Sequence, residues 1–328
     1  MRPGFSASGI DAMNLLILLN LPEPVRLRYY NHIKTAFPEL TVNLVDHNTK
    51  VDPYIGTTDI LVTFGAHMAD HVLEKGRNLK WIQALGTGVD GIVDRPTLRD
   101  GVLVTNFHGK HGPPMSEATI ALMLALSRNL PRSVRSQSQG KWDRFAPRLL
   151  HEKTVGIFGV GAIAKELAPK CKAFGMRVAG ITSAKREVPG FDCMYARDEL
   201  ETAVKDLDFL VLLTPLTAET RGIVNAGILA AMKPTSYLVN VARGGVVDEA
   251  ALVEALKQGR IAGAALDVFT REPLPEDHPF WRMDNVIITP HLGGFHVGYV
   301  DEALPILDDN IRRFVAGDLA NMHFVVRR

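Results

Sequence analysis

The sequence predicts an α/β protein that contains two doubly wound parallel sheets, and three observations lead to this prediction. Short apolar runs of strand length alternate with helical patterns along most of the 328 residues. A glycine turn at 159–161 joins one such run directly to a helix. Polar residues follow several of the runs, at the places where open α/β sheets bind their ligands. The chain is also long enough for two domains of ordinary size.

The first alternating series occupies residues 14–106. We expect its strands and helices to form βαβ units on a parallel sheet, with strands at 15–19, 41–45, 60–63, 81–84 and 102–104 and helices around 24–35 and 69–75. The apolar run at 15–19 is too short for a secretory signal and has no small-residue cleavage site, so it is interpreted as the first buried strand. The Gly- and Ser-rich segment 1–12 is interpreted as a leader, a cloning remnant or a disordered tail.

A largely apolar helix is expected at 117–128, with Ser116 as its N-cap and Pro131 ending it. Its composition predicts burial between two domains. A polar stretch at 132–140 follows, and then a second alternating series, with strands at 155–158, 177–181, 209–213, 237–240, 263–266 and 286–289.

Composition restricts the class of protein. The chain is 46% hydrophobic and 22% charged, with a formal net charge of +1 and no long Lys/Arg run, so we expect neither a nucleic-acid partner nor a membrane partner. A small molecule or another copy of the chain is the expected partner. The two cysteines, Cys171 on a predicted helix and Cys193 on a predicted loop, have no metal-type spacing, which favours a reducing compartment such as the cytoplasm.

The turn after the strand at 155–158 has the parts of a dinucleotide site. Gly159 allows a tight turn, Gly161 lets the backbone approach a pyrophosphate, and the following helix offers free N–H groups to the phosphates. Ala164 is the third small residue, where the helix packs closely on the strand. An ordinary βα turn is the alternative. The expected cofactor contacts here are Gly159, Val160, Gly161, Ala162 and Ile163.

Three residues with acid/base or anion-binding chemistry follow three strands of the second series. Arg243 has a charged planar fork that suits a carboxylate. His291 is an acid/base near neutral pH, and Glu272 beside it would hold one tautomer. Together with a hydride from a nicotinamide, these groups could reduce a 2-oxo acid. Each residue alone could instead be structural. A glycine loop at 86–90, after a strand of the first series, could bind a carboxylate or be a plain turn.

The runs at 238–249, 265–275 and 288–294 resemble the D-2-hydroxyacid dehydrogenase family, and the similarity extends over most of the chain from Asn14. The resemblance implies that Arg243 binds the substrate, His291 exchanges the proton and Glu272 pairs with His291. It also implies that Asp267 hydrogen-bonds the nicotinamide carboxamide. Further cofactor contacts implied by the family pattern are Thr214, Pro215, Val241, Ala242, Gly293 and Gly294. The substrate carboxylate would meet Leu85, Gly86, Thr87, Gly88 and Val89.

The resemblance also implies a domain division and an assembly. Residues 1–106 with 300–328 would form a discontinuous substrate-binding domain, completed by a helix at 301–316. Residues 107–299 would form a Rossmann domain, and the active site would lie in the cleft between these two Rossmann/flavodoxin-like domains. A homodimer is implied as well.

The end of the second cofactor-domain strand predicts the choice of cofactor. An NAD-specific site would carry an acidic residue there, but this chain has Thr182 and Ser183, followed by Lys185 and Arg186. Two basic groups could neutralise a 2′-phosphate, so NADP(H) is the expected cofactor, with NAD(H) still possible. The alternative is an exposed basic loop.

The sequence therefore predicts an NADP-preferring oxidoreductase that reduces a small 2-oxo acid, of the glyoxylate or hydroxypyruvate kind, to the D-2-hydroxy acid. A dehydrogenase of another small anion, formate or phosphite, remains an alternative, as does a non-catalytic NAD(P)-binding sensor. No metal site is expected. His67 and His71 have helical spacing but no third ligand nearby, and His108 and His111 lie in a Gly/Pro-rich connection.

Overall fold

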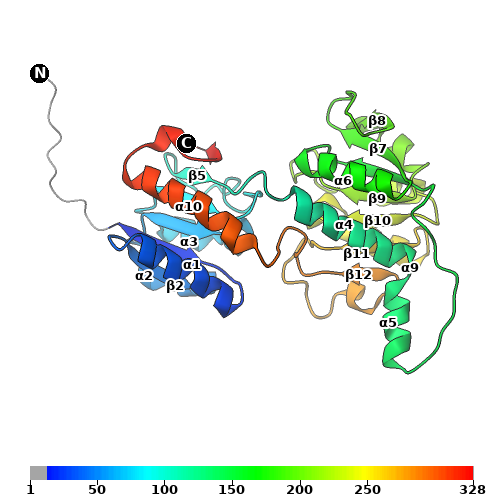
Figure 1. Cartoon of the computed structure of the whole chain (residues 1–328), viewed down its shortest axis with the longest axis horizontal. Coiled ribbons are helices and arrows are strands. Elements are labelled where there is room, and N and C mark those ends of the chain that lie inside the picture. The colour runs from blue at the N-terminus through cyan, green and yellow to red at the C-terminus, as the bar shows by residue number, and fades with distance from the viewer. Residues whose placement is uncertain (1–12, 328) are drawn as a thin grey trace, which may run out of the picture. The chain divides into compact units, whose positions relative to one another are not determined.

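The computed structural model describes residues 13–327, so the leader or tail predicted at 1–12 lies outside the described part of the chain. Contacts divide the chain into two compact units, which Figure 1 colours along the sequence. The first unit extends to Lys110 and resumes at Val297, and the second runs from His111 to His296. These borders lie a few residues from the predicted domain borders at 106 and 300.

The first unit contains a six-stranded sheet with the order β13-β5-β4-β3-β1-β2. Every strand pair is parallel except that β13 runs antiparallel to β5. Without β13, this is the flavodoxin-like order 2-1-3-4-5. The strands are β1 (Asn14–Leu18), β2 (Thr41–Val45), β3 (Ile60–Thr63), β4 (Trp81–Ala84), β5 (Leu103–Thr105) and β13 (Val325–Arg327). The helices are α1 (Glu23–Ala36), α2 (Asp52–Ile55), α3 (Asp70–Lys75) and α10 (Tyr299–Val315).

A buried polar network attaches α10 to the first sheet. The side chain of Asn310 on α10 is fully buried, and its Nδ2 donates to Gln83 Oε1 on β4 at 3.0 Å. Thr105 Oγ1 on β5 donates to the same oxygen at 2.9 Å. Asn310 Oδ1 accepts the N–H of His323 at 2.7 Å. The amides of Asn310 and Gln83 together therefore connect two strands, the helix and the segment that leads to β13.

The second unit contains a seven-stranded parallel sheet with the order β12-β11-β10-β9-β6-β7-β8. If β6 is counted as strand 1 and β12 as strand 7, the order from β8 to β12 is 3-2-1-4-5-6-7. This is the Rossmann order 3-2-1-4-5-6 with β12 as one further strand. The strands are β6 (Thr154–Phe158), β7 (Arg177–Thr182), β8 (Cys193–Ala196), β9 (Phe209–Leu212), β10 (Tyr237–Asn240), β11 (Gly263–Leu266) and β12 (Val286–Ile288). The helices are α4 (Gly112–Ser127), α5 (Leu130–Ser138), α6 (Ala162–Ala173), α7 (Leu200–Val204), α8 (Ala226–Ala231) and α9 (Glu249–Lys257).

Three local predictions in the second unit are wrong. Ser116 does not cap α4 but is buried inside it, and its Oγ donates to Pro113 O. The helix begins earlier because prolines fit its first turn, where a missing N–H costs nothing. Asn129, in a left-handed conformation, separates α4 from α5, and Pro131 lies in the first turn of α5 instead of ending α4; α5 includes most of the polar stretch at 132–140. Cys193 lies on β8, not on a loop.

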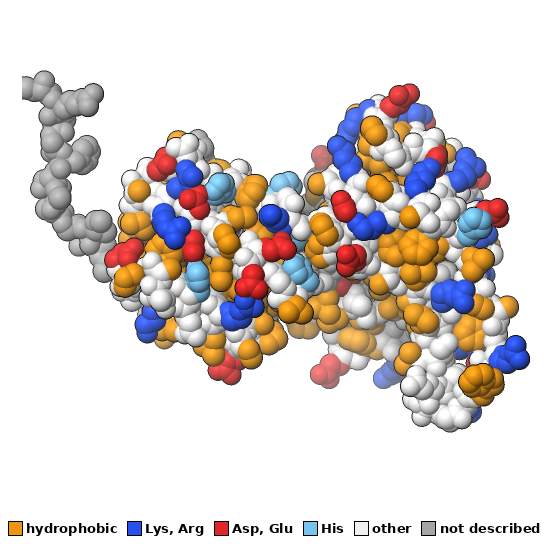
Figure 2. Space-filling model, viewed as in Figure 1, with side chains coloured by type: hydrophobic (Ala, Val, Ile, Leu, Met, Phe, Trp, Pro, Cys, Tyr) orange, Lys and Arg blue, Asp and Glu red, His pale blue; other side chains and the backbone are white. Residues whose placement is uncertain are grey.

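The buried side chains of α4 cover the second sheet. This helix packs on α6 and contacts β10 and β11, and Met123 on it is fully buried. Its burial between two domains stays a prediction. On the face that Figure 2 shows, basic and acidic side chains are intermixed over both units, which matches the near-zero net charge. Among the described residues, no helix is both long and apolar enough to cross a membrane.

Replacing Asn310 by Leu should destabilise the first unit by about 2 kcal/mol, because the buried side chain of Gln83 loses a donor and the backbone groups of His323 lose their part-buried partner. Hydrogen exchange of the β4 and β5 amides measures this free energy. Asn321→Leu is the control, since Asn321 is exposed and bonds only Asp318 at the surface. Equal protection in the two variants would contradict the role of the network.

Candidate active site

Arg243, Glu272 and His291 follow three neighbouring parallel strands of the second sheet. Arg243 comes after β10, Glu272 after β11 and His291 after β12. Their carboxyl ends meet at one edge of the sheet, which is where ligands bind in this architecture. The imidazole Nδ1 of His291 lies 2.7 Å from Glu272 Oε2. The predicted pairing of a histidine with a carboxylate is therefore present in the geometry.

Glu272 is held as a carboxylate. Its Oε1 accepts the N–H of Phe269 at 2.9 Å. Burial alone would raise the pKa of Glu272, but the hydrogen bond and charge of His291, the Phe269 N–H and the charge of Arg243 together lower it below its ordinary value of 4.5. Because the folded-state pKa is lowered, the ionised carboxylate stabilises the folded chain above about pH 4.5, and this contribution is lost as the pH falls further.

His291 lies on a loop whose backbone is held by Asp267. The φ angle of His291 is +55°, a conformation that side chains other than glycine rarely adopt. Its N–H donates to Asp267 O at 2.8 Å. The Asp267 carboxylate accepts three more hydrogen bonds, from Thr289 Oγ1 at 2.6 Å, Leu292 N at 2.8 Å and Gly293 N at 2.8 Å. One buried carboxylate thus fixes the turn that carries the histidine.

The sequence did not indicate this role of Asp267, because no local pattern shows that its side chain reaches a loop more than twenty residues later. The structure places the side chain at 2% exposure, with both oxygens bonded to its own chain. Its predicted hydrogen bond to a nicotinamide carboxamide stays a prediction. Gly293 must remain small here, since a Cβ would lie 2.9 Å from Asp267 Oδ2.

The loop that carries Arg243 packs directly on the loop that carries Glu272. At Gly244, an added Cβ would lie 1.9 Å from the carbonyl carbon of Phe269, so only glycine allows this approach. Asn240 Nδ2 donates to Arg243 O at 3.0 Å, and Arg243 Nη1 donates to Ala242 O at 2.6 Å. The arginine is thereby positioned by its own backbone at the end of β10.

The glycine turn after β6 has the shape that a dinucleotide needs. Gly159 has φ +103°, and a Cβ there would lie 2.5 Å from Thr214 N, where the ends of β6 and β9 approach each other. These two strands are where the strand order reverses, the usual position of a ligand crevice. Gly161 has an ordinary φ of −103° and open space where a Cβ would stand. None of the described residues requires a glycine at this position, which fits a ligand lying against it.

The helix after this turn leaves its first N–H groups available to an anion. Within the described residues, α6 has no side-chain cap hydrogen bond and no acidic residue in its first turn. Ala164 is fully buried, as expected for close packing on β6. The other predicted cofactor residues also follow strand ends of the same sheet: Val160, Ala162 and Ile163 after β6, Thr214 and Pro215 after β9, Val241 and Ala242 after β10, and Gly293 and Gly294 after β12.

The residues predicted to choose the cofactor lie at the end of β7. Thr182 is the buried last residue of the strand, while Ser183, Lys185 and Arg186 are exposed. Lys185 Nζ is 3.4 Å from both carboxylate oxygens of Glu199. Two basic side chains therefore flank this strand end, and one of them has an acidic neighbour.

The loop at 85–89 belongs to the first unit, whereas the arginine, glutamate and histidine belong to the second. Phe107 N donates to Gly86 O at 3.1 Å, and Asn106 Nδ2 donates to Thr87 O at 2.8 Å. Thr87 Oγ1 donates back to Phe107 O at 2.9 Å. Within the described chain the N–H groups of Gly88 and Val89 make no hydrogen bond. Consecutive unbonded N–H groups are suited to an anion.

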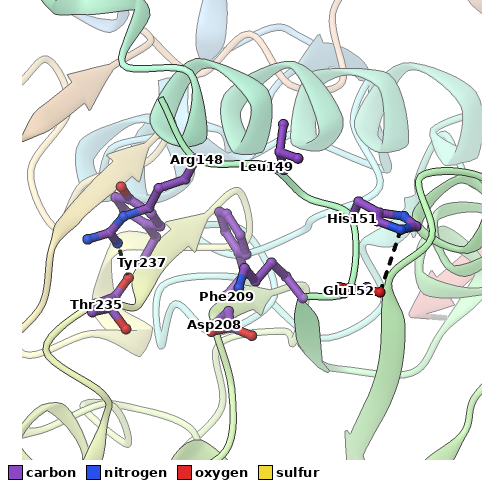
Figure 3. Close-up of a pocket in the computed structure, with 9 residues that line it drawn as sticks. Arg148, Leu149, His151, Glu152, Asp208, Phe209, Thr235 and Tyr237 are labelled. Carbon is purple, nitrogen blue, oxygen red and sulfur yellow. Dashed lines mark hydrogen bonds and ion pairs between the residues drawn. The ribbon is translucent and has the colours of Figure 1, made fainter. Parts of the chain in front are cut away.

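A pocket of about 470 Å³ lies at the amino ends of β6, β9 and β10, away from the strand ends that carry these residues. Figure 3 shows Arg148 reaching Thr235, whose carbonyl accepts from Nη1 at 2.6 Å, and His151 facing Glu152. None of the predicted site residues lines it. It is therefore a separate feature of the second unit.

The histidines outside the site form no metal centre in the described part of the chain, where no group of three His, Cys, Asp or Glu side chains could hold an ion. His71 Nε2 lies 2.9 Å from Asn48 O, so its contact is with the backbone. His111 precedes α4 and lies beside Gly294, where an added Cβ would meet its ring at 2.8 Å.

Replacing Asp267 by Asn should loosen the turn that carries His291. The side-chain NH2 would face the N–H of Gly293 and leave two donors opposed, so we expect the Leu292 and Gly293 amides to exchange about ten- to a hundredfold faster. Hydrogen exchange without any ligand measures this. Asp248→Asn, at a helix N-cap where Asn serves equally well, is the control. Unchanged exchange at 292–293 would contradict the assignment.

Comparisons with known proteins agree with the geometry. A family model described as D-isomer specific 2-hydroxyacid dehydrogenase, NAD binding domain, matches residues 120–293. The D-3-phosphoglycerate dehydrogenase of Methanocaldococcus jannaschii is 38% identical over 273 residues, which are 81% of this chain and 51% of that protein. The hydroxypyruvate reductase of Thermotoga maritima is 37% identical over 253 residues, 76% of this chain and 81% of that protein.

A solved structure supports the same relationship. The NADPH-dependent glyoxylate/hydroxypyruvate reductase from Sinorhizobium meliloti, in complex with NADP and malonate, matches with a TM-score of 0.82 and 28% identity, covering 97% of this chain and 99% of that one. The chain spans only about half the length of the phosphoglycerate dehydrogenases from M. jannaschii and Archaeoglobus fulgidus, at 51% and 46%. The family model matches just over half of the chain, and the Thermotoga relative is covered over most of its length. The chain belongs to the D-2-hydroxyacid dehydrogenase family.

Proposed function

We propose that this protein uses NADPH, in preference to NADH, to reduce a small 2-oxo acid of the glyoxylate or hydroxypyruvate kind to its D-2-hydroxy acid. The observation that carries the proposal is the 2.7 Å contact between His291 and Glu272, with Arg243 at the neighbouring strand end. A proton donor and an anion-binding fork thus stand at one edge of a dinucleotide-type sheet.

Each residue has a role in this reaction. A bound nicotinamide supplies the hydride to the carbonyl carbon. Arg243 binds the carboxylate of the acid and polarises its carbonyl. His291 donates a proton from Nε2 to the carbonyl oxygen, because Nδ1 is engaged by Glu272. The charged Glu272 orients the ring and stabilises its protonated form.

The chain's own groups bind the cofactor in this proposal. Gly159 and Gly161 let the backbone approach the pyrophosphate, and the first turn of α6 offers its N–H groups to it. Lys185 and Arg186 neutralise the 2′-phosphate of NADP(H). The pair between Lys185 and Glu199 is exposed, and such pairs contribute only about 0–1 kcal/mol, so it gives way to a phosphate. The NADP complex of the Sinorhizobium relative supports this preference, whereas the description of the family model names NAD.

The substrate is proposed from relatives that this chain covers over most of their length. The hydroxypyruvate reductase from Thermotoga is matched over 81% of its length, the phosphoglycerate dehydrogenases over about half. Oxidation of NADPH and NADH by a panel of 2-oxo acids separates the proposed reaction from its alternatives, which are formate or phosphite oxidation and a non-catalytic sensor role. No activity with either cofactor on any acid would refute the proposal.

The carboxylate-binding role of the loop at 85–89, the homodimer and a cytoplasmic location stay predictions. For the homodimer, α5 and the segment after it extend from the second unit in Figure 1 and carry exposed apolar side chains, including Val134 at 63% and Trp142 at 92% exposure. Apolar surface of this kind is typical of a protein interface. Sedimentation equilibrium tests it.

Replacing His291 or Arg243 by Ala, or Glu272 by Gln, should lower kcat by about a hundredfold or more, because each removes a proton-transfer or charge-stabilising group. The Kd of NADPH, measured by fluorescence, should stay within about twofold of the wild type, since these residues act on the acid. Glu249→Gln is the matched control. The Glu249 carboxylate accepts the N–H of Thr270 in the same loop, but the partner of His291 is Glu272 and the proposed reaction gives Glu249 no role. Turnover like that of the wild type in any of the three variants would refute its assigned role.

The double variant Lys185→Ala/Arg186→Ala should raise KM for NADPH about tenfold and leave KM for NADH unchanged, because only NADP(H) carries a 2′-phosphate. Steady-state kinetics with both cofactors measures the ratio. Lys257→Ala/Arg260→Ala removes the same charge from the surface near the end of α9 and is the control. Equal catalytic efficiency of the wild type with both cofactors would overturn the preference.

A further inference from the structure

Tyr299, the first residue of α10, lies under the carboxyl edge of the first sheet. Its side chain is 3% exposed. The ring packs edge-on against Phe107, with centroids 5.4 Å apart, and lies 6.4 Å from the ring of Phe64. Phe64 directly follows β3, and Phe107 comes two residues after β5. A single side chain thus contacts the ends of two strands that flank β4.

The Tyr299 hydroxyl donates to the carbonyl of Leu85, which directly follows β4. The ladder between β4 and β5 ends at Gln83 and Thr105, so this carbonyl lies beyond it. Leu85 is 1% exposed, and a buried carbonyl needs a donor. The hydroxyl is protonated at neutral pH, since the ordinary pKa of tyrosine is 10.0, and burial raises the pKa of Tyr299 further.

From these contacts we infer that Tyr299 is a positioning residue for substrate binding: its hydroxyl fixes Leu85 and so sets the loop whose Gly88 and Val89 N–H groups receive the carboxylate of the 2-oxo acid. The inference rests on the proposed function for the identity of the anion. The loop has its other anchor at Asn106 and Phe107, whose hydrogen bonds hold Gly86 and Thr87. Tyr299 fixes the start of the loop, and Asn106 fixes its middle.

The chain provides a matched control in Tyr29 on α1. This tyrosine is also fully buried in the first unit, but its hydroxyl has no hydrogen-bond partner in the described part of the chain. Tyr29→Phe therefore removes the same atom from the same kind of environment without breaking a hydrogen bond. Any effect of Tyr299→Phe that Tyr29→Phe lacks belongs to the bond with Leu85.

In steady-state assays with NADPH, Tyr299→Phe should raise KM for the 2-oxo acid about tenfold, the size expected when a buried carbonyl loses its donor. The kcat and the Kd of NADPH should stay within about twofold of the wild type, because His291, Arg243 and the glycine turn are unchanged. Tyr29→Phe should leave all three constants unchanged. An unchanged KM, or an equal fall in kcat and cofactor affinity, overturns the inference.

Hydrogen exchange gives a readout that needs neither substrate nor activity. Peptides that contain residues 85–92 should exchange faster in Tyr299→Phe than in the wild type or in Tyr29→Phe, while exchange in β1 and β3 stays the same. Unchanged exchange at 85–92, or a rise throughout the first unit, overturns the positioning role. A wild type that reduces no 2-oxo acid refutes the proposed function instead, and the exchange experiment still decides whether Tyr299 sets the loop.

Discussion

The buried carboxylate of Asp267 is the interaction on which the proposed catalytic edge depends. It binds the hydroxyl of Thr289 and the N–H groups of Leu292 and Gly293, while the carbonyl of Asp267 accepts the N–H of His291. These bonds hold the histidine in a left-handed conformation that it would rarely adopt alone. The segment after β11 therefore supplies both the partner of the histidine, Glu272, and the group that fixes its turn, Asp267.

The two units use the carboxyl ends of their strands in similar ways. In the second unit, glycines at 159 and 244 allow neighbouring loops to approach closely enough to bring strand-end residues together. In the first unit, hydrogen bonds from Tyr299, Asn106 and Phe107 hold a glycine loop whose N–H groups at 88 and 89 bond to none of the described residues. The second unit presents an acid, His291, and a cation, Arg243, whereas the first unit presents backbone N–H dipoles, and both arrangements suit a small anion.

Much of the fold could be predicted because its signals are local. Parallel strands buried on both faces consist of short apolar runs that can be recognised in the sequence. Five strands have the predicted bounds: 41–45, 60–63, 81–84, 237–240 and 263–266. Helix boundaries were harder, because Ser116 and Pro131 each fit two structures locally: a serine can cap a helix or lie inside one, and a proline can end a helix or begin the next one. β8 and β13 were missed, since short strands at a sheet edge carry little hydrophobic pattern.

By itself, the sequence determined which chemical groups follow which strands: the glycine turn, the arginine, the glutamate, the histidine and the basic pair at 185–186. Chain order fixes this, because each group lies within a few residues of a strand recognisable from its own composition. Only the tertiary structure decided that Asp267 holds the turn of His291 and that Tyr299 holds Leu85. Those contacts join residues 26 and 214 positions apart, and no local pattern encodes which side chains meet once strands pair and helices pack.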